Sequence, residues 1–182
     1  MLHNTHQSYT PALEPYELNE RALIIDTETV GVGPSIEIVE LALGDCSGEI
    51  VYHTLVRPLF NKIPRATKEP RFERDEFGAA PEWADVWAEV APLVNNKLLV
   101  AYNAAFDRRA LSAMRERYRQ PANERGWRCA MQLVKRAVGA RKNLTLADAC
   151  ALYNLAGGNH RADVDVKATC QLLRAVSSAM TR

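Results

Sequence analysis

ALIIDTETV, residues 22–30, joins a short apolar run to two acidic residues. The run Ala22–Thr27 is typical of a buried β-strand. Alternate side chains of a strand share a face, so Asp26 and Glu28 leave the same face about 7 Å apart. Two such carboxylates repel each other unless a cation lies between them, and oxygen ligands suit Mg²⁺ or Mn²⁺. The stretch predicts a metal site, although an Asp-x-Glu triplet also occurs by chance where a strand reaches solvent.

The rest of the chain predicts a sheet with helices around it. Apolar and alternating runs predict strands at residues 36–44, 49–56, 97–102 and 127–129, and helical periodicity predicts helices at 81–94, 106–119, 131–138, 145–155 and 162–180. The second and third strands form a hairpin across a glycine-containing turn. Residues 57–80 hold three prolines and predict a long irregular connection, which in compact domains is usually functional or disordered. Three strands followed by alternating helices and strands predict an α/β domain with a mixed sheet.

Composition indicates one soluble globular domain. The chain has 182 residues, of which 47% are hydrophobic and 25% charged, with a net charge of +1. We expect a poorly ordered N-terminal arm at 1–20 and a single domain at 21–182. No apolar run is long enough to span a membrane and no secretory signal is visible, so we expect a cytoplasmic protein without membrane association. The four cysteines form no C-x-x-C pair, which argues against zinc, and Cys150 and Cys170 are expected to be buried, reduced thiols.

Charge is distributed unevenly along the chain. Residues 1–56 hold nine acids against one base, whereas residues 104–142 hold eleven bases against three acids. The two segments are either solvated faces that happen to balance, or an acidic metal centre beside a basic surface that holds a polyanion. In the helix predicted at 106–119, we expect Arg108, Arg115 and Arg119 to form a solvent-facing stripe.

Two further acids fall on the inner faces of helices. Asp107 begins one helix on a stripe of apolar residues, which favours a cleft, although a first-turn acid can also simply complement the helix dipole. Asp165 lies on the inward face of the last helix, where a carboxylate is costly unless it is paired or binds metal. Asp163, two residues earlier, lies on an exposed face with Lys167 one turn away. We therefore expect Asp165, and not Asp163, to be functional.

His160 precedes Asp165 by five residues, so on one continuous helix the two side chains would point about 140° apart. We place His160 on the loop before the helix, where Gly157 and Gly158 give a flexible lead-in. An imidazole that titrates near neutral pH, on a loop above carboxylates, suits a general base. The alternative is an exposed loop histidine without a role.

Together, Asp26-x-Glu28, Asn103-x-x-x-Asp107 and His160-x-Ala162-x-x-Asp165 resemble the motifs of the DEDDh 3′–5′ exonucleases. That family includes the epsilon proofreading subunit of DNA polymerase III, exonuclease X, ribonuclease T and oligoribonuclease. The resemblance runs from about Ala22 to Ala179 and includes the stretches EIVELA and LTLADACALYNL. Single motifs of this length are weak, but three in register are specific.

The resemblance implies a ribonuclease H-like fold, with a five-stranded mixed sheet whose second strand is antiparallel. It implies two Mg²⁺ (or Mn²⁺) ions, with Asp26 bridging them and His160 as the general base. The ions would be held by Asp26, Glu28, Asp107 and Asp165. The substrate would be nucleic acid with a free 3′ end, single-stranded or frayed DNA being favoured, and the products 5′-mononucleotides. Expected substrate contacts are Thr27, Thr29, Asn103, Phe106, Phe72 and Arg108.

Two alternatives stay open at this point: an exoribonuclease of the same family, and a non-catalytic nucleic-acid-binding module.

The chain departs from the family pattern at several positions. Residues 62–72 lack the histidine that many relatives carry there, so Phe72 or Ile63 could stack on the terminal base instead. Tyr102 replaces a common histidine, and Val30 stands where a small hydroxyl residue is frequent. No polymerase-docking segment follows the last helix, so we expect a free-standing exonuclease, with a homodimer possible.

Overall fold

The computed structural model describes residues 11–61, 72 and 74–180. Five strands form one sheet in the order β3-β2-β1-β4-β5. The strands are β1 (Ala22–Val30), β2 (Glu37–Gly44), β3 (Ile50–Leu55), β4 (Leu98–Ala101) and β5 (Gly126–Cys129). Strands β1, β4 and β5 are parallel, whereas β2 runs antiparallel to both β1 and β3. The predicted mixed sheet with an antiparallel second strand is confirmed.

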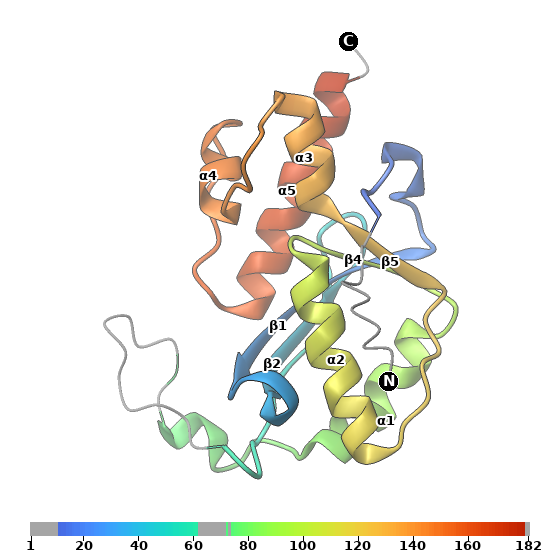
Figure 1. Ribbon diagram of the computed structural model, residues 1–182, viewed down its shortest axis with the longest axis vertical. Coiled ribbons are helices and arrows are strands. Elements are labelled where there is room, and N and C mark those ends of the chain that lie inside the picture. The colour runs from blue at the N-terminus through green and yellow to red at the C-terminus, as the bar shows by residue number, and fades with distance from the viewer. Residues whose placement is uncertain (1–10, 62–71, 73, 181–182) are drawn as a thin grey trace, which may run out of the picture.

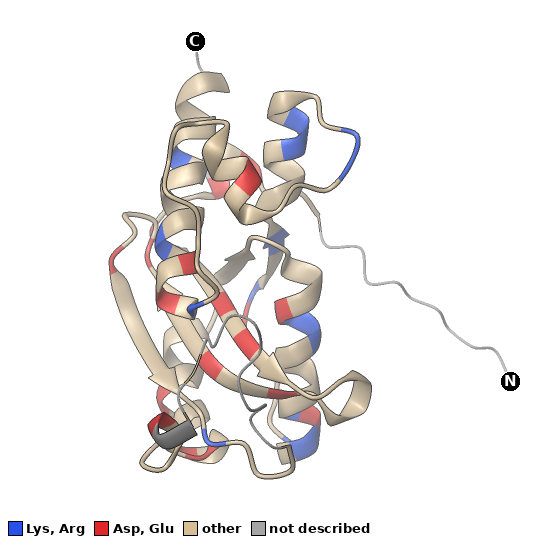
Figure 2. Ribbon diagram, turned by 90° about the vertical axis from the view of Figure 1, so that its left-hand side faces the viewer, with Lys and Arg blue, Asp and Glu red and all other residues tan. Residues whose placement is uncertain are grey.

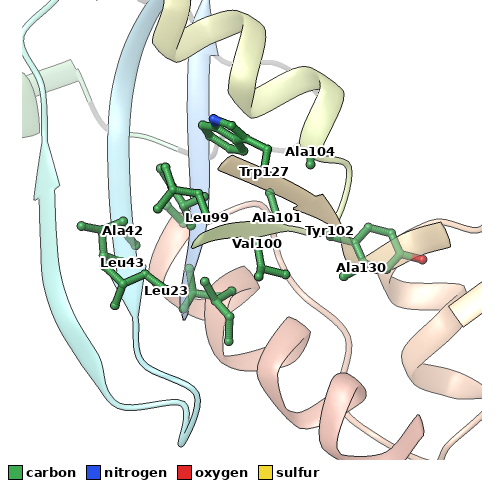
Figure 3. Packing of buried hydrophobic residues seen from close by; sticks show 14 of the residues in the cluster. Leu23, Ala42, Leu43, Leu99, Val100, Ala101, Tyr102, Ala104, Trp127 and Ala130 are labelled. Atoms are coloured by element: carbon green, nitrogen blue, oxygen red, sulfur yellow. The ribbon is translucent and has the colours of Figure 1, made fainter. Parts of the chain in front are cut away.

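Helices cover both faces of the sheet (Figure 1). The α-helices are α1 (Trp83–Val94), α2 (Ala104–Tyr118), α3 (Ala130–Val138), α4 (Leu146–Ala151) and α5 (Ala162–Met180), and three short 3₁₀ turns lie at Pro15–Glu17, Gly33–Ser35 and Arg74–Phe77. Figure 3 shows Trp127 on the side of the strands that faces α2, and Val100 on the side that faces α5. No helix among the described residues is long and apolar enough to cross a membrane.

Strand β2 differs from the half-exposed strand that its alternating sequence suggests. All eight of its residues are buried, because helices cover both faces of the central sheet. Glu37 and Glu40 are therefore carboxylates inside the protein, 1% and 0% exposed. Each must accept hydrogen bonds there, since an unpaired buried charge is strongly unfavourable.

Residues 11–20 do not form the poorly ordered arm expected from the sequence. Pro11 and Leu13 exchange backbone hydrogen bonds with Cys129 at the edge of β5, and the Leu13 side chain is fully buried. The acidic residues of this segment form ion pairs with bases far along the chain: Glu14 with Arg136, and Glu17 with Arg128. Residues 1–10 lie outside the described part of the chain.

Several expected boundaries shift by a few residues. Strand β1 continues to Val30, three residues past its apolar run, because it stays paired with β2 up to Glu37. Helix α1 begins at Trp83 rather than at Pro81, and α4 ends at Ala151 rather than at residue 155. The four cysteines are unpaired, and Cys150 and Cys170 are buried as expected.

Candidate active site

Strand β1 carries two of the predicted acids, Asp26 and Glu28, near the end of the sheet where β4 gives way to α2. Glu28 lies directly opposite Glu40 of β2, and the pairing of the two strands shifts register immediately after Glu28. Such irregularities redirect side chains at the edges of functional sites. Figure 2 shows that acidic positions gather on these central strands, with basic positions on surrounding helices and loops.

Asp107 lies in the first turn of α2 and is 3% exposed. Its Oδ1 accepts hydrogen bonds from the Thr27 backbone N–H (3.0 Å) and the Thr27 hydroxyl (2.9 Å). The residue between the two acids of β1 therefore attaches the third acid to the strand. Asp107 also lines a pocket, which agrees with the cleft that its helix position favours.

Asp165 is 8% exposed on α5, and its Oδ1 accepts from the backbone N–H groups of Asn159 (2.9 Å) and His160 (3.3 Å). His160 lies on the loop before α5 with an exposed side chain, as expected. One potential ligand atom from each of Glu28, His160 and Asp165 lies within 4.8 Å of the others. Asp163 instead forms the exposed ion pair with Lys167, at 3.4 Å, that its helix position predicts.

Burial and mutual repulsion raise the pKa of the central acids. The pKa of Asp26 is held well above its ordinary value, first by burial and then by the charges of Asp107, Asp165, Glu28 and Glu40. Burial likewise raises the pKa of Asp107 to about 7, despite the hydrogen bonds from Thr27. Four carboxylates held together in this way are unfavourable unless a cation neutralises them.

Divalent metal ions fit this set of residues. The donors are carboxylate oxygens, which Mg²⁺ and Mn²⁺ prefer, and they come from three separate elements, β1, α2 and α5, whose acids line one pocket. The pKa of both Asp26 and Asp107 is raised, chiefly by burial, so the charged form of each carboxyl is disfavoured in the folded chain. A bound cation would remove that penalty.

A pocket of about 460 Å³ opens beside the acids. Of the residues predicted from the sequence, the pocket is lined by Asp26, Thr27, Glu28, Asn103, Phe106, Asp107, His160 and Asp165. Thr29 and Arg108 are outside this lining. Phe72 is also outside it, because its ring packs edge-on against Phe77 (5.4 Å) and carries the Arg161 guanidinium on a face (5.1 Å). Ile63, the other suggested stacking residue, lies outside the described residues.

One wall of the pocket is formed by residues that none of the three sequence motifs contains. Met131 and residues 143–146 line it, although they lie far from the three motifs in the chain. The Tyr102 hydroxyl approaches the backbone carbonyls of Leu144 and Thr145, 3.0 Å from each, and so ties this loop to the start of α2. The tyrosine that departs from the family pattern thus has a structural role, which only the folded chain reveals.

The expected stripe of exposed arginines on α2 is partly wrong. Arg115 is buried, where it forms a 2.6 Å ion pair with Glu124 and packs on the Trp87 ring. Arg108 is half-buried, and Arg119 is exposed at the end of the helix, as expected for the stripe. Helical periodicity alone could not reveal the acidic partner that Glu124 provides from the loop before β5.

Comparisons with known proteins agree with this geometry. The sequence profile of the exonuclease family, RNase_T, matches residues 23–173. A protein of Escherichia phage 186 named "Uncharacterized exonuclease CP81" is 32% identical over 175 residues, which cover 88% of this chain and 90% of that protein.

Solved structures show the same fold. Exonuclease X in complex with 5′ overhanging duplex DNA is 29% identical, with a TM-score of 0.62 over 88% of this chain and 91% of the solved one. The nuclease domain of 3′hExo, described as a DEDDh family member bound to rAMP, has the same TM-score and coverage at 16% identity. With its four acids and histidine in the family's order, this chain belongs to the exonuclease family and is a hydrolytic nuclease of the DEDDh type.

Proposed function

We propose that this chain is a metal-dependent 3′–5′ exonuclease that removes 5′-mononucleotides from single-stranded or frayed DNA ends. The observation that carries the proposal is the convergence of Glu28, His160 and Asp165 within 4.8 Å, beside buried Asp26 and Asp107. All four acids and the histidine are present, which argues against a non-catalytic binding module.

The metal ions would be held by Asp26, Glu28, Asp107 and Asp165, which all line the same pocket. When bound, two divalent ions supply a more acidic water and stabilise negative charge on the leaving oxygen. Thr27 keeps one oxygen of Asp107 engaged through two hydrogen bonds, and so fixes the direction of its other oxygen.

His160 is the group that takes the proton. The water oxygen attacks the terminal phosphorus, the bond from phosphorus to the 3′-oxygen breaks, and the water's proton passes to the imidazole. The leaving 3′-oxygen takes up a proton from solvent, which leaves a shortened strand with a 3′-hydroxyl and a free 5′-mononucleotide. No side chain needs to form a covalent intermediate.

The pocket offers both polar and apolar surface for a terminal nucleotide. Phe106 contributes an aromatic ring, with the Arg109 guanidinium 5.9 Å from its centroid, and Asn103 contributes an exposed amide. A base can stack on such a ring whatever its identity. Arg108 follows Asp107 on α2 outside the pocket lining, and we propose that it contacts the phosphate backbone.

DNA is favoured as substrate because the solved structure of exonuclease X, which is 29% identical to this chain, holds DNA. The choice between DNA and RNA depends on contacts to the 2′-hydroxyl. The alternative function is that of an exoribonuclease of the same family, so the experiment must compare DNA with RNA.

The test uses single-stranded DNA and RNA of matched sequence, labelled at the 5′ end, with Mg²⁺ or with chelator. A substrate with a blocked 3′ end controls for polarity. We expect a Mg²⁺-dependent ladder that shortens from the 3′ end, faster on DNA, with 5′-mononucleotide as product. In addition, His160→Ala should lower the rate by roughly 100-fold at neutral pH. Faster cleavage of RNA would overturn the substrate assignment, and products that begin at internal sites would overturn the polarity.

A further inference from the structure

Glu40 of β2 is a buried carboxylate that the proposed chemistry does not use. It is fully buried, and lies opposite Glu28 across the strand pair. Its Oε1 accepts from Nε2 of His53 (2.8 Å) and from Nε of Arg161 (3.0 Å), and its Oε2 accepts from the backbone N–H of Ala162 (3.0 Å). Both oxygens are therefore engaged, as a buried carboxylate requires.

Two of these three donors immediately follow His160 in the chain. His160 has φ +62°, a left-handed conformation that is unfavourable for a residue with a side chain. Asp165 holds the preceding part of this loop by accepting from the backbone N–H groups of Asn159 and His160. The loop also comes so close to Asp165 that a Cβ at Gly158 would overlap its carboxylate.

The loop is thus held between two carboxylates, Asp165 from the helix and Glu40 from the sheet. We propose that Glu40 is a positioning residue that fixes the backbone at Arg161 and Ala162 and thereby holds the His160 imidazole beside Glu28 and Asp165. This inference rests on the proposed function, because it assigns to Glu40 a role in aiming the general base. Arg161 contacts a further residue besides Glu40, because its guanidinium also stacks on the Phe72 ring. We call the contacts of Glu40 with Arg161 and Ala162 the Glu40 anchor.

A metal site is the competing interpretation of the same residues, because ligand atoms of Glu40, His53 and Asp163 lie within 4.8 Å of one another. The contacts disfavour it. Both oxygens of Glu40 already accept from three donors, and the Asp163 carboxylate faces Lys167. A cation there would have to displace these donors.

The same strand supplies a matched control in Glu37. It is also buried, and its carboxylate accepts from the backbone N–H groups of Leu59, Phe60 and Asn61. Replacing either glutamate by glutamine keeps the shape but turns one acceptor into a donor, so both variants carry a similar structural penalty. Only Glu40 contacts the residues next to His160.

The experiment compares Glu40→Gln and Glu37→Gln by single-turnover kinetics, KM for single-stranded DNA and thermal unfolding. Both variants should unfold at lower temperature than wild type. Glu40→Gln should lower kcat by about tenfold or more with little change in KM. Glu37→Gln should keep the wild-type kcat. Equal kcat values for the two variants would overturn the proposal; should Glu40→Gln fail to fold, Arg161→Gln tests the same anchor from its exposed side.

A double-mutant comparison separates positioning from general damage. Because Glu40 acts through the imidazole, adding Glu40→Gln to His160→Ala should produce no further loss of kcat. A further tenfold loss would contradict the proposed route through His160. If the wild-type protein shows no nuclease activity, the proposed function fails, and the NMR signals of His160 still test the positioning: Glu40→Gln should shift them and Glu37→Gln should not.

Discussion

Asp163 and Asp165 show how two residues of the same type, two positions apart, have different surroundings. Asp165 is buried and accepts from the loop that carries His160, whereas Asp163 forms a surface ion pair with Lys167. Exposed i, i+4 pairs contribute only about 0.3–0.5 kcal/mol. Asp163→Ala should therefore leave exonuclease activity nearly intact, and Asp165→Ala should abolish it. Rates on labelled single-stranded DNA check this pair, and loss of activity in the first variant alone would contradict the assignment.

The buried carboxyl of Asp107 should make the stability of the metal-free protein depend on pH. Its pKa in the folded protein, raised by burial to about 7, lies above the ordinary value near 4 of an unfolded chain. Above pH 7 the buried charge therefore destabilises the metal-free protein, and protonation relieves this as the pH falls from about 7 towards 4. Unfolding temperatures without metal should rise as the pH is lowered through that window, and saturating Mg²⁺ should flatten the dependence.

Asp107→Asn tests the same residue directly. The amide oxygen can still accept both hydrogen bonds from Thr27, but the buried charge is gone. The variant should be inactive yet more stable than wild type at pH 8 without metal, by on the order of 2 kcal/mol. Chemical denaturation at pH 8 and pH 5 measures this, and a variant less stable than wild type at pH 8 would argue against a charge penalty.

Among the secondary-structure elements, helix α2 is connected to the loop before β5 by a buried ion pair between Arg115 and Glu124. Although burial alone would raise the pKa of Glu124, hydrogen bonds from Arg115 and Trp127 lower it to about 2. The stability from this carboxylate is therefore present above its unfolded pKa near 4.3 and is lost as the pH falls towards 2. Glu124→Gln should lower the free energy of unfolding by about 1.5–3 kcal/mol at pH 7. The stability of this variant should also fall less steeply than that of wild type as the pH is lowered. Acid titration followed by circular dichroism would contradict this if the two proteins unfolded in parallel.

Most elements could be predicted from the sequence because apolar periodicity reflects which side faces the core. Helix α5 begins and ends where its pattern does, and the second strand is antiparallel, as the family resemblance implies. The errors concern polar residues whose partners lie far away in the chain. Glu40 and Arg115 are buried because Arg161 and Glu124 reach them, and no local pattern contains that information.

The candidate site shows the same limit. Its four acids and His160 could be predicted because family motifs preserve their order, and the structure brings them to one pocket. The wall at residues 143–146 and the anchor at Glu40 could not, since each depends on contacts between segments far apart in the sequence. Phe72 was expected at the substrate, but lies packed against Phe77 outside the pocket.

At the scale of the whole molecule, the structure sorts the basic residues into two groups. Several form ion pairs within the fold, namely Arg115, Arg117, Arg128 and Arg136. Arg141 and Lys142 are exposed and have no ion-pair partner among the described residues. They directly precede Asn143, which lines the pocket. If nucleic acid binds in this pocket, as the proposed function requires, we expect these two side chains to contact its backbone.

Salt dependence tests this arrangement. The double variant Arg141→Gln/Lys142→Gln should raise KM for single-stranded DNA and reduce the slope of log KM against log salt by about 1.4, because each charge contributes about 0.7 on a single strand. The control, Arg119→Gln/Arg125→Gln, removes the same charge from the far end of α2 and from the groove at the start of β5. It should leave the slope unchanged. An equal reduction in both variants would indicate attraction by overall charge rather than by the loop beside the pocket.

We propose that the acid cluster around Asp26 performs metal-dependent hydrolysis from a 3′ end. The most direct measurement compares wild type with Asp26→Asn, purified identically, on 5′-labelled single-stranded DNA across a Mg²⁺ titration. We expect a Mg²⁺-dependent 3′–5′ ladder for wild type and none for the variant, with DNA binding retained by both. A ladder of equal rate from Asp26→Asn, or wild-type cleavage that persists in excess chelator, would contradict it.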